Sequence, residues 1–469
     1  MDNTKKTVLI IGAGIGGLYT ALKFLEKGYK TTVIEKQNLA GGLSVSIPID
    51  GYKIDIGPHY MTLKKDSEIT REIFDLVGEE NIIQIKNIEK TYLSYYKGKI
   101  FTTVPTITDA IFASGSKSAF RSILGLISKS NSHLTDPDAT AEEYLRACFG
   151  NYLFENWCKP YLMQNFGNLD LPLEYVKNRF KPITKEKILK KVKKQNNEEL
   201  QIKTTHSQFI DCYFKDGIGQ LAIILKERIL QLGGKILLNS EIQDIKHGKI
   251  KEISYLEKGY NKKINTDIII YATPMNITKN WFREIRDDEI NTKSNFNAIL
   301  VTLFVDDSKL FNGWLLSVFD SKIPFFRISQ QNYLSSFVAP KNKSLITVEM
   351  RVDKNHELWT KDEIELRKIV EIHLRKMNIL NCNVDGGKVI KFQNLYSKFK
   401  KDDSDINEKI NKEIIKYSDE YILRTSEFDT GRFATTENRV NDDQVPSAGG
   451  IYNAISSVKK LVRHILDSD

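Results

Sequence analysis

Six residues near the amino end constrain this chain most: Gly12-Ala13-Gly14-Ile15-Gly16-Gly17. The apolar, β-branched run before them, residues 7–11, predicts a strand buried on both faces of a parallel sheet. After them, residues 18–27 carry apolar side chains at helical spacing, and residues 31–34 read as a second strand. The glycines alone would fit a simple tight turn. Strand, glycine turn, helix and strand together predict a dinucleotide-binding half-fold.

Each glycine of this motif has an expected task. Gly12 allows the sharp turn, Gly14 allows backbone to approach a pyrophosphate, and Gly17 allows the helix to pack tightly on the strand. The helix start around Gly16 offers N–H groups and the positive end of its dipole to the diphosphate.

An acidic residue ends the second predicted strand. Glu35 would accept both hydroxyls of an adenosine ribose and would repel a 2′-phosphate. We therefore expect FAD or NAD rather than NADP, with Glu35 and the adjacent Lys36 at the nucleotide.

A second glycine pair follows at Gly41 and Gly42, continued by Leu43 and Ser44. We expect it to run beside the same diphosphate, and simple nicotinamide dehydrogenases do not need such a pair. The arrangement resembles the flavoprotein superfamily that contains amine oxidases, protoporphyrinogen oxidase, phytoene desaturases and UDP-galactopyranose mutase, in which both segments bind FAD. The resemblance implies FAD as the cofactor. The basic residue usual before the second pair is replaced here by residues 39–40, Leu and Ala.

The length of the chain and the spacing of its cysteines limit the kinds of protein that it can be. At 469 residues the chain exceeds one ordinary core, which favours two domains. Its four cysteines show no Cys-x-x-Cys spacing, so we expect no metal site and no disulfide framework, in keeping with a reducing cytoplasm. No eighteen-residue apolar run and no leader-like start are seen, so we expect a cytoplasmic protein without a transmembrane segment.

The net charge of +9 is unevenly placed, with seven lysines in residues 181–194. These lysines fit either a solvated surface or an attraction for an anionic substrate or acidic lipid, which leaves a peripheral membrane contact open. No zinc finger, helix-turn-helix or aromatic-basic interleaving is present, so we expect a small-molecule substrate rather than nucleic acid as partner. The sequence predicts no oligomeric state.

Two further segments extend the resemblance. Gly57-Pro58-His59 resembles the mutase segment that runs along the flavin ring, although His59 alone would read as a turn histidine. The resemblance implies that these three residues lie near the isoalloxazine. It also places Ile242, in the second FAD segment, where backbone meets adenine.

Two arginines stand in mutase-like contexts. Taken alone, Arg179 and Arg327 would read as surface residues. The resemblance implies that both grip a substrate diphosphate, a task that suits the two-pronged guanidinium.

The carboxy-terminal part resembles the superfamily less closely. The turn at Gly431 and Arg432, and the later Gln444 and Val445, imply contacts with the flavin pyrimidine and diphosphate. The aromatic residues that mutases carry after this turn, including a tyrosine that touches phosphate, are replaced at positions 436–438 by Thr, Glu and Asn.

We therefore predict an α/β fold in which a Rossmann-type FAD-binding domain (residues 1–90, 208–275 and 415–469) joins a discontinuous α+β substrate domain (residues 91–207 and 276–414). Catalysis would use flavin N5, with His59, Arg179 and Arg327 as the active-site residues. Three functions remain open: a redox-neutral mutase acting on a nucleotide sugar in surface-glycan biosynthesis, an oxidoreductase of an amine, porphyrinogen or other hydride donor, and a non-catalytic FAD-binding partner.

Overall fold

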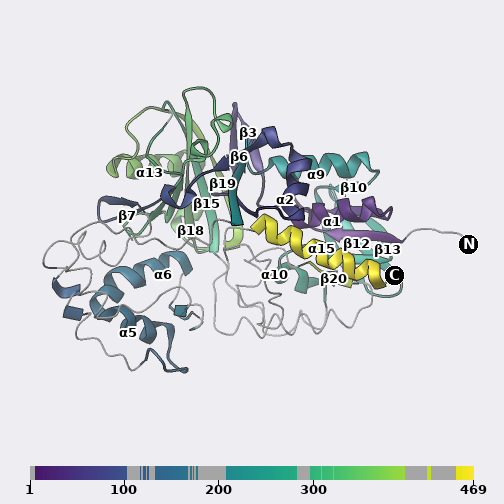
Figure 1. Cartoon of the computed structure of the whole chain (residues 1–469), viewed down its shortest axis with the longest axis horizontal. Coiled ribbons are helices and arrows are strands. Elements are labelled where there is room, and N and C mark those ends of the chain that lie inside the picture. The colour runs from purple at the N-terminus through teal and green to yellow at the C-terminus, as the bar shows by residue number, and fades with distance from the viewer. Residues whose placement is uncertain are drawn as a thin grey trace, which may run out of the picture.

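The computed structural model describes residues 6–102, 117, 120–122, 124–125, 133–166, 169–171, 173, 176–177, 208–282, 296–307, 309–320, 322–396, 420–423 and 450–468. Within these residues the strands form two large sheets and three small ones. The two large sheets occupy different parts of the molecule (Figure 1).

The first large sheet is parallel and has the strand order β10-β2-β1-β14-β20. Its members are β1 (Thr7–Ile11), β2 (Lys30–Ile34), β10 (Lys235–Leu237), β14 (Ile268–Tyr271) and β20 (Glu420–Ile422). The central strand β1 pairs with β2 on one side and with β14 on the other, so Ile10 lies opposite both Val33 and Ile270. An apolar run buried on both faces is what such a central position requires.

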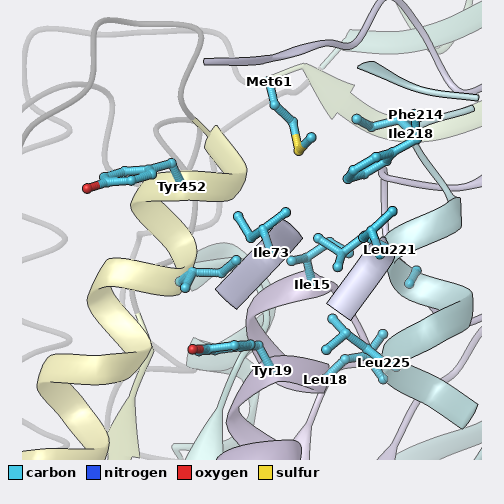
Figure 2. Close-up of a cluster of buried hydrophobic side chains, with 14 of the residues drawn as sticks. Ile15, Leu18, Tyr19, Met61, Ile73, Phe214, Ile218, Leu221, Leu225 and Tyr452 are labelled. Carbon is cyan, nitrogen blue, oxygen red and sulfur yellow. The ribbon is translucent and has the colours of Figure 1, made fainter. Parts of the chain in front are cut away.

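Helices cover one face of this parallel sheet. They are α1 (Ile15–Glu26), α2 (Glu68–Val77), α9 (Gln220–Gln231) and α15 (Gly450–Ser468). Figure 2 shows Leu18 of α1, Ile73 of α2 and Leu225 of α9 in one buried cluster, with Tyr452 contributed by α15. The carboxy-terminal helix therefore packs beside the first helix of the chain, as Figure 1 also shows.

An antiparallel meander covers the opposite face of the same sheet. It consists of β11 (Ser240–Lys246), β12 (Lys251–Glu257) and β13 (Tyr260–Thr266). Ile253 of the meander packs with Leu9 and Ile269 of the sheet in a separate buried cluster. The parallel sheet is thus covered on both faces.

The second large sheet is mixed and has the order β19-β15-β18-β17-β16-β7-β8. Its strands are β7 (Tyr92–Tyr96), β8 (Lys99–Thr102), β15 (Phe296–Val305), β16 (Leu315–Val318), β17 (Arg327–Ser329), β18 (Ser344–Val352) and β19 (Val384–Tyr396). Helix α13 (Glu363–Lys376) packs its apolar side on this sheet, and Asp362 caps it through a reciprocal bond with Glu365. Residues 97–98 form the hairpin turn between β7 and β8.

Smaller elements join the two sheets. The strands are β3 (Ser46–Ile49), β4 (Tyr52–Asp55), β5 (Met61–Lys64), β6 (Ile82–Ile85) and β9 (Phe209–Phe214). Between β8 and β9, the structure describes the helices α5 (Ala141–Leu153) and α6 (Lys159–Phe166). A π-helical turn at Phe154–Cys158 separates these two helices. Two short helices, α10 (Met275–Thr278) and α12 (Glu357–Thr360), and several 3-10 turns complete the described part.

The predicted fold class is confirmed: the chain is a mixed α/β protein with a Rossmann-like domain. Strands 92–102 and 296–396 share one sheet although residues 208–282 separate them in sequence. The predicted domain boundaries at 90, 207, 275 and 414 stay a prediction. In the described part of the chain, no helix has the length and apolar character needed to cross a membrane.

Candidate FAD site

The glycine motif forms the turn between β1 and α1. Gly12 has a φ of +106° and its N–H donates to the Ile34 carbonyl at 2.8 Å. A Cβ on Gly12 would lie 2.7 Å from the Ala272 carbonyl oxygen, and a Cβ on Gly17 would lie 2.0 Å from the Gly12 carbonyl oxygen. These two glycines are therefore required by the packing of the turn itself.

Gly14 differs from its neighbours. Among the residues that the structure describes, a Cβ built on Gly14 would meet no atom within 4 Å, and the φ of −66° is open to any residue. It precedes α1 directly, and no side chain caps the first turn of that helix. The packing of the protein thus gives no reason for a glycine here, whereas a diphosphate approaching the backbone does.

The second glycine pair lies against the first. The Gly41 N–H donates to the Ala13 carbonyl at 2.7 Å, and Gly14 and Gly41 form an isolated parallel bridge. A Cβ on Gly42 would lie 3.2 Å from the Gly14 Cα. Leu43 and Ser44 continue this segment, with Leu43 exposed. Two stretches of bare backbone, far apart in sequence, therefore run side by side.

Glu35 is fixed at the carboxyl end of β2 by backbone donors. Its Oε2 accepts the Ala13 N–H and its Oε1 accepts the Gln37 N–H, each at 2.9 Å. The carboxylate thus lies next to the glycine turn, while Lys36 beside it is exposed. Ile242 sits at a bulge in β11, partly buried against the meander side of the sheet. A glycine cradle with a carboxylate at its edge fits the diphosphate and ribose of FAD.

The segment expected beside the flavin ring, residues 57–59, follows β4, and we call it the ring-side segment. Gly57 has a φ of +85° and leads through Pro58 to His59, whose Nε2 donates to the Ile56 carbonyl at 2.8 Å. Burial lowers the pKa of His59, and the positive charge of Arg327 adds to this effect. The imidazole is therefore neutral at pH 7, with its proton on Nε2.

Arg327 forms a two-pronged ion pair in the second sheet. Its Nε and Nη2 donate to Oε1 and Oε2 of Glu349, each at 2.6 Å, across the β17–β18 register. Glu349 is 1% exposed, whereas the Arg327 side chain is 28% exposed. A Cβ on Gly57 would lie 3.7 Å from Glu349 Oε2 and 3.9 Å from His59 Nε2. Two predicted segments, 57–59 and 327, therefore meet at Glu349.

Sequence reasoning missed Glu349. Its signal was present, because it is the only charged residue in the apolar run of residues 345–350. A lone carboxylate in a buried strand needs a partner, and here Arg327 supplies it.

Three aromatic residues lie beside this group and were also missed. Tyr60 follows His59, Tyr92 begins β7, and Trp314 precedes β16. Their ring centroids are 5.2 Å apart for Tyr60 and Trp314 and 5.5 Å apart for Tyr92 and Trp314. Burial raises the pKa of Tyr92, Tyr60 adds to this rise, and the charge of Arg327 opposes it. The Arg327 group is thus bordered by aromatic rings.

Other predicted site residues lie outside the described part of the chain. They are Arg179, Gly431, Arg432, Gln444 and Val445, and the lysine-rich residues 181–194 lie there as well. Whether Arg179 and Arg327 converge therefore stays a prediction. Among the described residues, no cluster of three or more His, Cys, Asp or Glu could hold a metal ion.

Comparisons with known proteins identify a domain family and structures of similar fold. The family of NAD(P)-binding Rossmann-like domains matches residues 10–76. A crystal structure of reduced UDP-galactopyranose mutase aligns with a TM-score of 0.76 at 16% identity, covering 98% of this chain and 96% of that one. A putative protoporphyrinogen oxidase from Exiguobacterium sp. 255-15 aligns with a TM-score of 0.69 at 16% identity, covering 99% of both chains. The comparisons therefore show a Rossmann-like NAD(P)-binding domain at residues 10–76, within a mixed α/β fold that is shared with these two structures.

Curated relatives share part of the sequence. Phytoene desaturase of Fusarium fujikuroi is 30% identical over 186 residues, which make up 38% of this chain and 31% of that protein. Coproporphyrinogen III oxidase of Staphylococcus aureus is 27% identical over 337 residues, 66% of this chain and 69% of that protein. The match to the desaturase thus spans about a third of that protein's length.

Proposed function

We propose that this protein is a mutase-like flavoenzyme that acts on a nucleotide-linked sugar, with Arg327 at the substrate diphosphate. The observation that carries the proposal is the meeting of Arg327 with the Gly57–His59 segment, although about 270 residues separate the two in sequence. The similarity to the UDP-galactopyranose mutase structure concerns the fold, and it supports the proposal only in that sense.

Bound FAD would supply a reactive centre at N5 of its ring. The glycine segments at Gly14 and Gly41, with Glu35, would hold its nucleotide half. Neutral His59, donating to the Ile56 carbonyl, would stand beside the ring without adding charge. Arg327, oriented by Glu349, would present its exposed side to phosphate oxygens of the substrate.

A second candidate is a net oxidation of a carbon–hydrogen donor. The Arg327–Glu349 pair favours it, because a carboxylate that accepts two guanidinium N–H groups weakens the attraction of Arg327 for an anion. The aromatic group of Tyr60, Tyr92 and Trp314 would suit an apolar or ring-containing donor. The names of the curated relatives, a desaturase and a porphyrinogen oxidase, point the same way.

The two candidates differ in their use of electrons. Purified protein, its flavin reduced anaerobically with dithionite, is incubated with a panel of nucleotide sugars, and the products are separated by chromatography. The mutase proposal expects isomeric product that requires reduced flavin but consumes no reductant. Absence of isomerisation, with rapid reoxidation of the flavin by oxygen, would favour the oxidoreductase.

A matched pair of variants tests the role of Arg327. Arg327→Ala is expected to lower kcat/KM at least about tenfold through loss of charge-assisted bonds to phosphate. Arg375→Ala is the control, because Arg375 also donates twice to a glutamate, Glu371, but does so on the exposed side of α13. Equal activity in the two variants would remove Arg327 from the site.

A further inference from the structure

Asp55 is a buried carboxylate that the proposed chemistry does not use. Its oxygens accept hydrogen bonds from the Ser46 hydroxyl at 2.5 Å, from the Tyr213 hydroxyl, and from the Ile218 N–H at 3.3 and 3.4 Å. The residue is 3% exposed. A Cβ on Gly217 would lie 2.8 Å from Asp55 Oδ1, so the surrounding backbone is closely packed around the carboxylate.

The partners of Asp55 come from the segments that form the candidate FAD site. Ser46 lies just beyond the glycine segment of residues 41–44, and its hydroxyl also accepts the Gly219 N–H at 2.9 Å. Asp55 itself lies just before the ring-side segment, and the Ile56 N–H donates to the Val45 carbonyl at 3.3 Å. The carboxylate therefore fastens the diphosphate-side segment to the ring-side segment.

Gln331 extends this cluster to the second sheet. Its Oε1 accepts the Asp55 N–H at 2.9 Å and its Nε2 donates to the Lys53 carbonyl at 2.8 Å. Gln331 comes four residues after Arg327, just beyond the end of β17. One amide side chain thus connects the strand of Arg327 to the strand that leads to His59.

We propose that Asp55 and Gln331 are positioning residues for FAD, which hold residues 41–46, 56–59 and 327–331 in fixed relation. Neither residue needs to contact the cofactor, because each one holds in place backbone segments that are expected to contact it. FAD affinity and the environment of the flavin ring should therefore depend on Gln331, which lies in the predicted substrate domain. The proposal goes beyond the choice of substrate and holds for a mutase or an oxidoreductase alike.

Adjacent glutamines provide a matched test. Gln330 is also buried. Its side chain accepts the Leu310 N–H at 2.7 Å and donates to the Phe311 and Gly313 carbonyls, which all lie in the connection between β15 and β16. We expect Gln331→Ala to raise the dissociation constant of FAD about tenfold and to change the visible spectrum of the bound flavin, because two buried bonds are lost. Gln330→Ala should lower thermal stability to a comparable extent. Its dissociation constant for FAD should stay within about twofold of the wild-type value, and the visible spectrum of its bound flavin should not change.

Equal effects of Gln331→Ala and Gln330→Ala on FAD affinity and spectrum would overturn the proposal, since both changes would then act through stability alone. The same holds if neither variant changes the flavin readouts.

Asp55 is tested with its conservative variant. Asp55→Asn keeps the shape and part of the acceptor capacity, so its FAD affinity should lie between those of wild type and Asp55→Ala. Asp267→Asn serves as the control, because Asp267 accepts the Thr7 N–H and hydroxyl at the opposite end of β1. A loss of FAD affinity in Asp267→Asn equal to that in Asp55→Asn would contradict a specific role for Asp55.

Discussion

At the scale of single residues, two buried carboxylates organise the ring side of the candidate site. Glu349 is neutralised by a guanidinium, whereas Asp55 is surrounded by hydroxyl and backbone donors. Burial raises the pKa of Asp55 to about 7, although the bonds from Ser46 and Tyr213 act in the opposite direction. The two carboxylates therefore respond differently to pH and to substitution.

The raised pKa of Asp55 predicts a pH-dependent stability. The unfolded chain ionises this group near its ordinary pKa of about 4, so the contribution of Asp55 is fully present below that pH and is lost as pH rises through about 7. Asp55→Asn removes the titration. Between pH 5 and pH 8, urea denaturation should show the wild type losing about 2 kcal/mol more unfolding free energy than the variant. Parallel pH profiles would show that Asp55 ionises normally in the fold.

The Arg327–Glu349 pair predicts a large effect of truncation. Glu349→Ala removes the buried carboxylate that pairs with Arg327 and should therefore lower the unfolding free energy by about 3 kcal/mol. Glu349→Gln keeps one acceptor and should cost less. The control is Glu371→Ala on the exposed face of α13, expected to change stability by less than about 0.5 kcal/mol. Urea midpoints decide the order, and a Glu349→Ala protein as stable as Glu371→Ala would contradict the buried pair.

At the scale of elements, the β1–α1 turn separates fold requirements from ligand requirements. A Cβ on Gly17 would clash with the Gly12 carbonyl, whereas a Cβ on Gly14 would meet no atom of the described residues within 4 Å. The same residue type therefore serves two purposes within one short turn. The helix could form without glycine at 14, but a diphosphate could not approach the backbone there as closely.

This contrast gives a prediction for two alanine variants. Gly17→Ala should lower stability by more than about 2 kcal/mol, because backbone must shift to admit the Cβ. Gly14→Ala should leave the stability of the FAD-free protein unchanged and still raise the dissociation constant of FAD about tenfold. Thermal denaturation of the FAD-free protein, combined with flavin titration, measures both. Loss of stability in Gly14→Ala would assign that glycine to the fold instead.

At the scale of the whole molecule, helix α15 packs beside α1 in the layer that covers the parallel sheet. Val458 of α15 is fully buried in the same cluster as Leu18 and Leu22 of α1. Lys459 beside it pairs with Glu68 and Glu72 of α2. The helical layer on the parallel sheet therefore combines α1 from the amino-terminal part of the chain with α15 from the carboxy-terminal part.

A pair of charge substitutions on α15 tests this closure. Val458→Asp places a carboxylate in an apolar cluster and should cost about 3 kcal/mol or more of unfolding free energy. Arg463→Asp, on the exposed side of the same helix, should change it by less than about 0.5 kcal/mol. Soluble yield and urea midpoints give the comparison. If both variants behave alike, α15 contributes little to the core.

The sequence by itself determined the local elements of the first domain. The Rossmann-like fold follows from the strand, the glycines and the helix, because periodicity and glycine placement act over a few neighbouring residues. These residues with Glu35 indicated FAD or NAD, and the resemblance of the second glycine pair to flavoproteins implied FAD. Gly14 and Gly41 were both expected beside one diphosphate, and their backbones lie side by side in the fold.

Only the tertiary structure decided which distant side chains meet. Glu349 pairs with Arg327 because β17 and β18 adopt one particular register, and no pattern within either strand specifies that register. Gln331 reaches Asp55 across 276 residues because the β3–β4 pair packs against the second large sheet, where Tyr52 stacks on Phe304. Local pattern selects the elements, whereas packing between elements selects the contacts, and the segments expected beside the flavin ring are joined by such contacts.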